Sequence, residues 1–285
     1  MGAWPRPDDP SPRGSDIDLG RGVSARDDVY SDRIRCDHPN AGVSARWLVA
    51  RLREMARERG RRRLVIFCGR SMAEALFVEG LELEASIPGY YAGSEACFVL
   101  ADWPGGTLQV DAEALAPVDE LIAGAVAKRR SGAVVKTRRA GLADAPAIAA
   151  LITQCFEHYP TPSGVPSYVA QAIMDGIPFR VVDQEGAVVA CASADLVRAA
   201  HTAELTDCAT RPDFRGRGLM QALLLGLMED LSALGYATAY TLARAQEPGM
   251  NIAFKRLGFE WNGRMVSSCR IGSGLEDMNV WSRVL

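Results

Sequence analysis

The sequence lacks several features that would point to common protein classes. It has only three histidines, and neither they nor its seven cysteines fall at metal-ligand spacings, which predicts no metal site. No apolar run approaches the roughly 20 residues that span a bilayer, and no apolar signal segment opens the chain. The net charge of −3 gives no electrostatic reason to bind nucleic acid or an anionic membrane. Scattered, odd-numbered cysteines are typical of reduced thiols, so we expect a cytoplasmic protein. The oligomeric state stays open, a homodimer included.

Two common nucleotide-binding signatures are also missing. The chain contains neither a Walker loop nor the Gly-x-Gly-x-x-Gly turn of a dinucleotide fold. Its 285 residues, 48% apolar and 24% charged, are ordinary for a soluble protein with one large or two modest domains. Strand and helix patterns alternate along the chain, which predicts an α/β fold.

The stretch Glu204–Met220 carries the strongest local signal. It predicts a strand, a short loop with Gly216 and Gly218 flanked by Arg215 and Arg217, and then a helix from Leu219 to about 234. Glycines let backbone N–H groups approach a ligand closely, and a helix start leaves such groups unpaired beside a partial positive charge. The pattern therefore favours an anion-binding cradle, with pyrophosphate as its occupant. A plain helix-entry turn is the alternative.

Composition and pattern divide the chain into three parts. Residues 1–22 are rich in Pro, Asp, Arg, Gly and Ser, which predicts a disordered extension. Residues 23–130 predict a smaller N-terminal α/β accessory domain, and a linker follows. Residues 133–285 predict the second domain, in the order strand, helix, helix, hairpin, strand, glycine loop, helix, strand, helix, strand.

The glycine loop resembles motif A of the GNAT acetyltransferases through Arg215, Gly218 and Met220. The segment 251–259, an Asn-led helix that ends in Leu-Gly-Phe, resembles the closing motif of that superfamily. The resemblance implies a mixed central sheet flanked by helices and a loop whose amides hold the coenzyme A pyrophosphate. It also implies that Asn251 contacts the coenzyme A arm. The tyrosine that often protonates the departing thiolate is Phe254 here, so that role passes elsewhere or to water.

Longer phrases resemble the β-lysine N-acetyltransferase family, and the likeness runs from about Tyr30 to the C-terminus. The phrases are residues 87–93, 203–210, 215–220, 243–245, 248–251, 269, 272 and 276–281. This resemblance implies transfer of an acetyl group from acetyl-CoA, as co-substrate, to the ε-amine of β-lysine. The product, Nε-acetyl-β-lysine, serves as a compatible solute under salt stress.

The N-terminal segment repeats the pattern of the C-terminal one in reduced form. A helix, Gly60, the strand 64–68, and a helix ending at Gly80 parallel the helix, Gly235, strand 238–243 and the helix ending at Gly258. The first copy has no counterpart of the glycine loop. We interpret it as a degenerate GNAT-like half without a cofactor. A plain accessory domain is the alternative.

Direct transfer to an amine needs a clamp for the thioester, a donor that polarises its carbonyl, and a base. The resemblance assigns the clamp to the backbone of Arg215, Gly216, Arg217, Gly218, Leu219 and Met220. Cys208, Ala209 and Thr210 would pair with the pantetheine arm as if with another strand, and a backbone N–H of that strand would polarise the carbonyl.

An ε-ammonium group titrates near 10.4 in water, so it needs a base or desolvation to react at neutral pH. We favour Glu204 as the base, then Asp207. Strand alternation places these two carboxylates on opposite faces unless a bulge intervenes. Either one is equally well interpreted as structural.

Further residues are candidates for contacts with the acceptor. Glu276 and Asp277 would bind its ammonium groups, and Arg244 would meet its carboxylate or form a surface salt bridge. An acyl intermediate on Cys208 is disfavoured, because no histidine pairs with it in the sequence.

Two rival functions remain open. One is a GNAT enzyme that acetylates another small amine, such as a polyamine, lysine or a diamino acid. The other is a non-catalytic acyl-CoA-binding regulator. This interpretation is supported by Phe254, which stands where the superfamily often has the proton-donating tyrosine.

Overall fold

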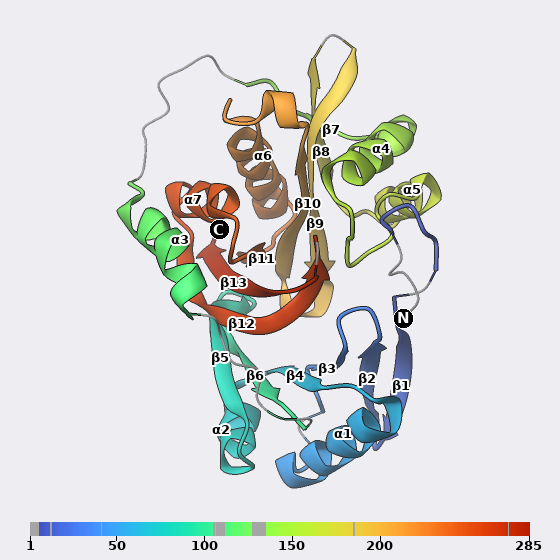
Figure 1. Cartoon of the computed structure of the whole chain (residues 1–285), viewed down its shortest axis with the longest axis vertical. Coiled ribbons are helices and arrows are strands. Elements are labelled where there is room, and N and C mark those ends of the chain that lie inside the picture. Colours follow the sequence, from blue (N-terminus) through green and yellow to red (C-terminus); the bar gives the residue numbers. More distant parts are fainter. Residues whose placement is uncertain are drawn as a thin grey trace.

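The computed structural model describes residues 6–11, 13–40, 42–104, 106, 112–126, 135–184, 186–272 and 274–285. Within them, thirteen strands form one strongly curved sheet in the order β1-β2-β3-β4-β6-β5-β12-β13-β11-β10-β9-β8-β7 (Figure 1). The first six strands in this order belong to residues 15–102, the N-terminal half, and the other seven to residues 135–285, the C-terminal half. The predicted mixed α/β architecture is confirmed.

The C-terminal half follows the predicted element order. Most elements lie within a few residues of the bounds expected from alternating apolar positions and helix-period repeats. Strand β7 is shorter than the strand expected over 134–138, and residue 134 lies outside the described residues. The elements are β7 (Arg138–Arg139), α4 (Ala145–Cys155), α5 (Pro166–Met174), β8 (Phe179–Gln184), β9 (Ala187–Val197), β10 (Thr202–Thr210), α6 (Leu219–Ala233), β11 (Thr238–Arg244), α7 (Pro248–Arg256), β12 (Glu260–Ile271) and β13 (Gly274–Val284).

The N-terminal half contains six strands and two helices. They are β1 (Ser15–Gly20), β2 (Val23–Asp28), β3 (Arg33–Asp37), α1 (Ala45–Arg59), β4 (Arg63–Cys68), α2 (Arg70–Val78), β5 (Glu82–Tyr91) and β6 (Glu95–Asp102). The expectation of disorder over 1–22 is wrong for Ser15–Gly20, which pairs with β2 as an antiparallel hairpin. The hairpin forms because Ile17, Leu19, Val23 and Ala25 alternate and bury one face against α1. Residues 1–5 and 12 lie outside the described residues.

The two halves repeat one topology. In each, three successive antiparallel strands lead to a parallel pair, β3 with β4 and β10 with β11. A helix connects each parallel pair, and two antiparallel strands complete each half. This correspondence supports the interpretation of the N-terminal half as a GNAT-like half rather than an unrelated accessory domain.

Strands β5 and β12 join the halves at Gly263, which lies opposite Ala85. A Cβ atom at position 263 would lie 2.1 Å from the Glu84 carbonyl oxygen, so only glycine permits this approach. The sheet then curves until the inner faces of the two halves meet (Figure 1). Val65 and Phe67 from the N-terminal half pack there with Tyr240 and Val280 from the C-terminal half.

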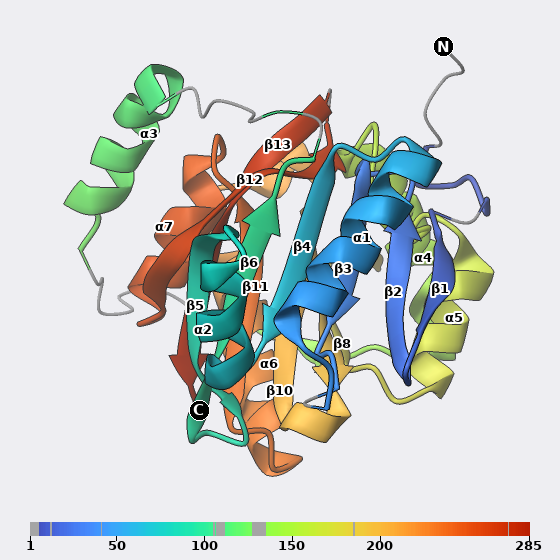
Figure 2. The same ribbon diagram turned by 90° about the horizontal axis from the view of Figure 1, so that it is seen from below.

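Helices cover the outer faces of both halves. Helices α1 and α2 lie outside the N-terminal strands (Figure 2), and α6 and α7 cover the outer face of β10, β11 and β13. Helices α4 and α5 pack on the inner face of β8 and β9, beside the N-terminal half. Helix α3 (Ala112–Gly124) was expected within the accessory domain, but it packs on α7, where Lys255 Nζ donates to the carbonyl oxygens of Ile122 (2.9 Å) and Ala123 (2.8 Å).

Candidate active site

The glycine loop, the predicted anion cradle, lies directly before α6. Gly216 and Gly218 both have φ near 75°, a left-handed conformation that favours glycine, and a Cβ atom at either position would meet nothing within 4 Å. Gly218 is the N-cap of α6 and supplies no side-chain cap. The hydrogen bonds seen among the described residues include none from the backbone N–H groups of 216–221. These donors are therefore open to an anion.

The side chains around the cradle leave its backbone exposed. Arg215 and Arg217 are both exposed, and Arg217 stacks over the Phe214 ring at 4.6 Å from its centroid. Leu219 is buried in the core below α6, so it offers only its backbone, and Met220 packs partly against the same core. The structure thus brings all six predicted cradle residues together.

Strands β10 and β11 separate in front of this cradle. Their parallel pairing extends only from Thr202–Thr238 to Glu204–Tyr240. One further contact, from Thr241 Oγ1 to the Leu205 carbonyl (2.8 Å), closes the apex. Beyond it, Ala209 and Thr210 pair with β9, Cys208 lies within the register shift, and none of the three pairs with β11. An extended chain such as a pantetheine arm can pair with that free strand edge.

A bulge interrupts β10 at Asp207, as the sequence analysis required for both carboxylates to share a face. Asp207 has φ of 48°, and the register with β9 shifts between Thr206 and Ala209. Its carboxylate accepts hydrogen bonds from Ser193 Oγ (2.7 Å) and Ser163 Oγ (3.0 Å). Burial raises the pKa of Asp207, while these hydroxyls act in the opposite direction. Asp207 is therefore held in place on both oxygens.

Glu204 lies at the apex, on the inner face of β10. Tyr240 Oη donates to Glu204 Oε2 at 3.1 Å. Burial raises the pKa of Glu204, and the Arg35 guanidinium and the Tyr240 hydroxyl partly oppose that shift. The other oxygen of Glu204 accepts no hydrogen bond from a residue that the structure describes. A half-buried carboxylate with a raised pKa and such an oxygen suits a general base better than Asp207 does.

Sequence reasoning missed a third carboxylate, Asp195. It lies directly opposite Glu204 on β9. Desolvation by the surrounding chain, together with Asp207 and Glu204, raises the pKa of Asp195 to about 8. The strict alternation of β9 places Asp195 on the same face as Ser193, but only the strand register, which the sequence does not give, sets it beside Glu204.

The N-terminal half contributes side chains that sequence reasoning also missed. His38 Nδ1 lies 2.9 Å from Tyr91 Oη, and its Nε2 lies 3.2 Å from Tyr90 Oη. The centroids of the Tyr90 and Tyr240 rings lie 5.6 Å apart. Because Tyr240 donates to Glu204, this contact connects His38, Tyr90 and Tyr91 to Glu204. Burial lowers the pKa of His38, so the imidazole is neutral at neutral pH.

Two of the predicted acceptor-binding residues, Arg244 and Glu276, form an ion pair with each other, and the third, Asp277, contacts the backbone of β12. Arg244 Nε and Nη2 donate to the two Glu276 oxygens, both at 2.7 Å, so the salt bridge left open by the sequence is formed. Asp277 Oδ1 accepts from the Ser267 backbone N–H (2.8 Å) at a positive-φ position of β12. All three residues thus have partners within the chain, and their binding of an acceptor stays a prediction.

Asn251 and Phe254 are both buried parts of the framework. Asn251 Nδ2 donates to the carbonyls of Arg244 (2.9 Å) and Glu247 (2.8 Å), while its Oδ1 accepts from Asn279 Nδ2 and Trp281 Nε1. These bonds occupy both N–H groups and the oxygen of the side chain, and its expected contact with coenzyme A stays a prediction. Phe254 packs edge-on against Phe259 in the core, where it takes no part in proton transfer.

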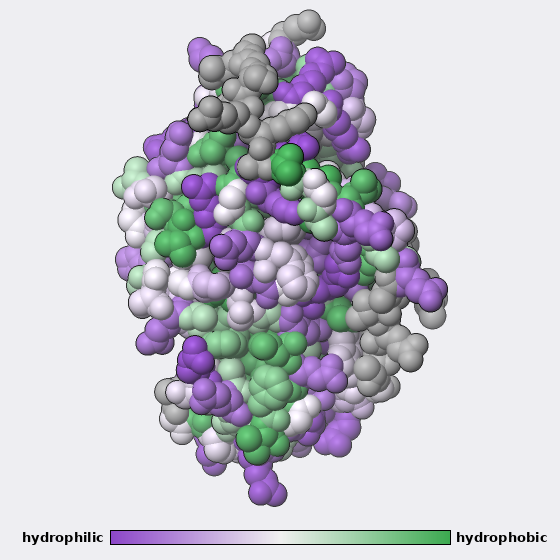
Figure 3. Space-filling view, turned by 90° about the vertical axis from the view of Figure 1, so that its left-hand side faces the viewer, coloured by the Kyte–Doolittle hydropathy of each residue, from purple (hydrophilic) through white to green (hydrophobic). Residues whose placement is uncertain are grey.

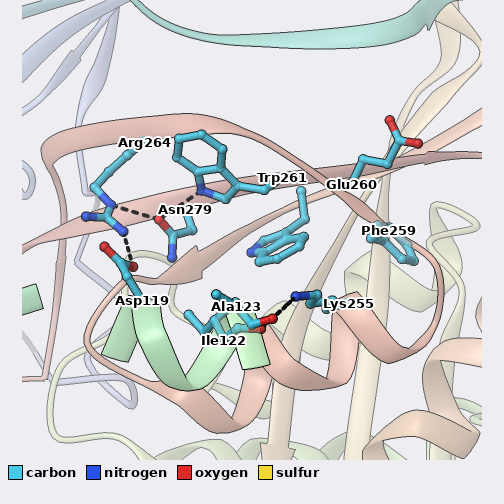
Figure 4. Close-up of a pocket in the computed structure, with 10 residues that line it drawn as sticks. Asp119, Ile122, Ala123, Lys255, Phe259, Glu260, Trp261, Arg264 and Asn279 are labelled. Carbon is cyan, nitrogen blue, oxygen red and sulfur yellow. Dashed lines mark hydrogen bonds and ion pairs between the residues drawn. The ribbon is translucent and has the colours of Figure 1, made fainter. Parts of the chain in front are cut away.

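A surface cavity of about 660 Å³ lies elsewhere, at the C-terminal end of α7. Figure 4 shows Trp261, Arg264 and Asn279 on one side and the end of α3 on the other. It shares no residue with the predicted site. Its lining residues are Asp119, Ile122, Ala123, Lys255, Phe259, Glu260, Trp261, Arg264, Asn279 and Trp281.

Two general features concern the described residues only. They hold no group of three or more His, Cys, Asp or Glu side chains placed to bind a metal ion. None of their helices combines the length and apolar character needed to cross a membrane.

On the face shown in Figure 3, apolar surface gathers at the lower end, where α2 and β5 leave Phe77, Val78 and Leu83 exposed.

Comparison with known proteins connects this geometry to a family. Residues 146–259 match the profile of the Acetyltransferase (GNAT) family. The chain is 43% identical to a β-lysine N(6)-acetyltransferase of Methanosarcina mazei over 52% of its own length, a match that spans 55% of that protein. It is 27% identical to the N-acetyltransferase YodP of Bacillus subtilis over 81% of this chain and 85% of the relative.

One solved structure is similar to about half of the chain. A GNAT superfamily phosphinothricin acetyltransferase from Sinorhizobium meliloti, solved in complex with acetyl-CoA, is 25% identical. It covers 54% of this chain and 89% of its own, with a TM-score of 0.46.

Proposed function

We propose that the chain transfers an acetyl group from acetyl-CoA to a small amine, because residues 146–259 match the model of the GNAT acetyltransferase family. The observation that carries this proposal is the opening between β10 and β11, with an uncapped helix start at Gly218 and Glu204 at its apex. The ε-amine of β-lysine is the acceptor we favour, since the Methanosarcina relative bears that activity in its name. The product would then be Nε-acetyl-β-lysine, with a role as a compatible solute.

The chain's own residues fit each step of direct transfer. The N–H groups after Gly216 would bind the pyrophosphate, and the free edge of β10 would pair with the pantetheine arm and polarise the thioester carbonyl. Glu204 would take the proton as the amine nitrogen attacks the carbonyl carbon. The C–N bond forms, the C–S bond breaks, and the coenzyme leaves as a thiolate. With Phe254 in the core, the thiolate proton would come from solvent.

The rest of the chain is consistent with a protein of a reducing compartment. All seven cysteines are free thiols, and we therefore propose a cytoplasmic location. A homodimer remains a prediction.

The test is thiol release from acetyl-CoA by the purified chain with β-lysine, α-lysine, ornithine, spermidine and a lysine peptide as acceptors. We expect turnover with β-lysine well above the others. Equal turnover with other amines would keep the acetyltransferase and remove the β-lysine assignment. Tight acetyl-CoA binding without turnover on any amine would contradict catalysis and favour an acyl-CoA-binding regulator.

A further inference from the structure

Strand β3 points alternate residues into two different environments. Ile34 and Cys36 pack in the outer core against α1, so Arg33 and Arg35 face the inner side, toward the C-terminal half. Arg63 on β4 lies in register with Arg33 and points the same way. Three arginines of the N-terminal half therefore face the catalytic half.

Two of these arginines donate hydrogen bonds through Nη nitrogens, and the third does not. Arg33 Nη1 donates to the Ser268 carbonyl at 2.6 Å, and Arg63 donates to the Val266 carbonyl and the Glu84 carboxylate. Arg35 is held only through Nε, which donates to both Asp37 oxygens (2.8 and 2.9 Å). Neither Nη nitrogen of Arg35 forms a hydrogen bond with a residue that the structure describes.

The open end of Arg35 is held in a fixed orientation. Its guanidinium carbon lies 4.4 Å from the centroid of the Phe67 ring, and 23% of the side chain is exposed. A guanidinium fixed through Nε and one ring face presents its two Nη groups as a fork that matches a carboxylate.

Arg35 lies on the same inner face as the proposed base. Phe67 belongs to the apolar cluster that contains Tyr90 and Tyr240, and Tyr240 donates to Glu204. The charge of Arg35 acts on both Glu204 and Tyr240. One small molecule with an amine at one end and a carboxylate at the other can therefore reach Glu204 with its amine and Arg35 with its carboxylate.

We propose that Arg35 binds the carboxylate of an amino-acid acceptor, so that the N-terminal half selects the amines that the C-terminal half acetylates. This inference rests on the proposed acetyl transfer and specifies its substrate class as an amino acid with a distal amine. Polyamines lack the group that Arg35 recognises.

The experiment compares each amino acid with its decarboxylated counterpart: β-lysine with 1,4-diaminopentane, and α-lysine with 1,5-diaminopentane. In the Arg35→Gln variant, kcat/KM for the amino acids should fall by about 100-fold, mainly through KM, as expected when one partner of a desolvated charge pair is removed. The diamines should change less than about threefold, because they make no such contact. Arg35→Lys should recover part of the loss, since it keeps the charge without the fork.

Arg53→Gln is the matched control. It removes another arginine of the same half, one ion-paired with Asp102 on the outer side, and it should change neither substrate class. Equal losses for amino acids and diamines in Arg35→Gln, or no loss at all, would overturn the inference. If the wild-type chain acetylated neither class, the proposed function would fail. Calorimetry would then still test the role of Arg35. Tighter binding of β-lysine than of 1,4-diaminopentane, with that difference lost in Arg35→Gln, would support carboxylate binding by Arg35. Equal binding of the two compounds by the wild-type chain would refute it.

Discussion

The N-terminal and C-terminal halves share a strand order, but only the second opens. Strands β3 and β4 stay paired through five register positions, from Arg33–Arg63 to Asp37–Phe67, whereas β10 and β11 pair through three. Strand β10 carries the bulge at Asp207, and no register shift interrupts the pairing of β3 with β2. A closed pair leaves no free strand edge for a pantetheine arm.

The helices that follow β3 and β10, namely α1 and α6, also differ in how they begin. Ser44 caps α1 by accepting a hydrogen bond from the Trp47 N–H (3.3 Å), while α6 begins at Gly218 without a side-chain cap. A capped helix start has one donor fewer for an anion. We therefore expect coenzyme binding to depend on two local features of the C-terminal half, the bulge in β10 and the uncapped start of α6, and not on the shared strand order.

The largest effect is expected from charge in the cradle. Gly218→Glu would place a carboxylate among the phosphates at a position with φ of 75°, and like charges at close range cost several kcal/mol, or about 1000-fold in Kd. Calorimetry with acetyl-CoA measures the change, and circular dichroism checks the fold. Ser44→Glu, at the equivalent point of the N-terminal half, should leave Kd unaltered. Unchanged affinity in Gly218→Glu would remove the argument for an anion site.

Loss of the proposed base should come next. Glu204→Gln should lower kcat by about 100- to 1000-fold, a typical contribution of a general base, with little change in the Kd of acetyl-CoA. Because burial raises the pKa of Glu204, wild-type activity should fall as pH drops through a pKa above the usual value of about 4.3, where the carboxylate becomes protonated.

The pH profile of the variant decides this point. The acidic limb assigned to Glu204 should disappear in Glu204→Gln and persist in Glu82→Gln, a change at an exposed carboxylate of the N-terminal half. Retention of both the rate and the limb in Glu204→Gln would exclude Glu204 as the base.

A moderate effect on stability is expected at Asn251. This side chain forms two hydrogen bonds with β13 and two with the carbonyls of Arg244 and Glu247. In contrast, α2, the counterpart of α7 in the N-terminal half, begins at Gly69 without a side-chain cap. Asn251→Ala would leave buried donors and acceptors unpaired, at a cost of about 2–3 kcal/mol in the free energy of unfolding. Urea unfolding measures it, with Asn262→Ala, which loses a single bond to Ser282, as the smaller control. A cost below that of the control would argue against the network.

The difference between the halves also shows what the sequence could reveal. Helix α6, strand β4 and the glycine loop were predictable because apolar periodicity and glycine placement are local signals. The length of β12 was not, since Gly263 and Ser267 adopt positive φ inside the strand and break its alternation. Strand register is not a local signal, so the sequence could not pair Arg244 with Glu276 or place Arg35 where its charge acts on Glu204. Both relations join residues far apart in the chain.

The smallest effect is expected at Cys208, on the free edge of β10. Burial raises the pKa of its thiol, with Asp207 and Glu204 acting in the same direction, so it stays protonated at neutral pH and is a poor nucleophile. Cys208→Ala should therefore leave kcat within about threefold of wild type, because direct transfer needs only the backbone of this residue. A stopped-flow trace should show no burst of free coenzyme in the absence of amine. A burst in wild type that vanishes in Cys208→Ala would mean that the chain acetylates itself first, and the free edge of β10 would then carry the nucleophile as well as the clamp.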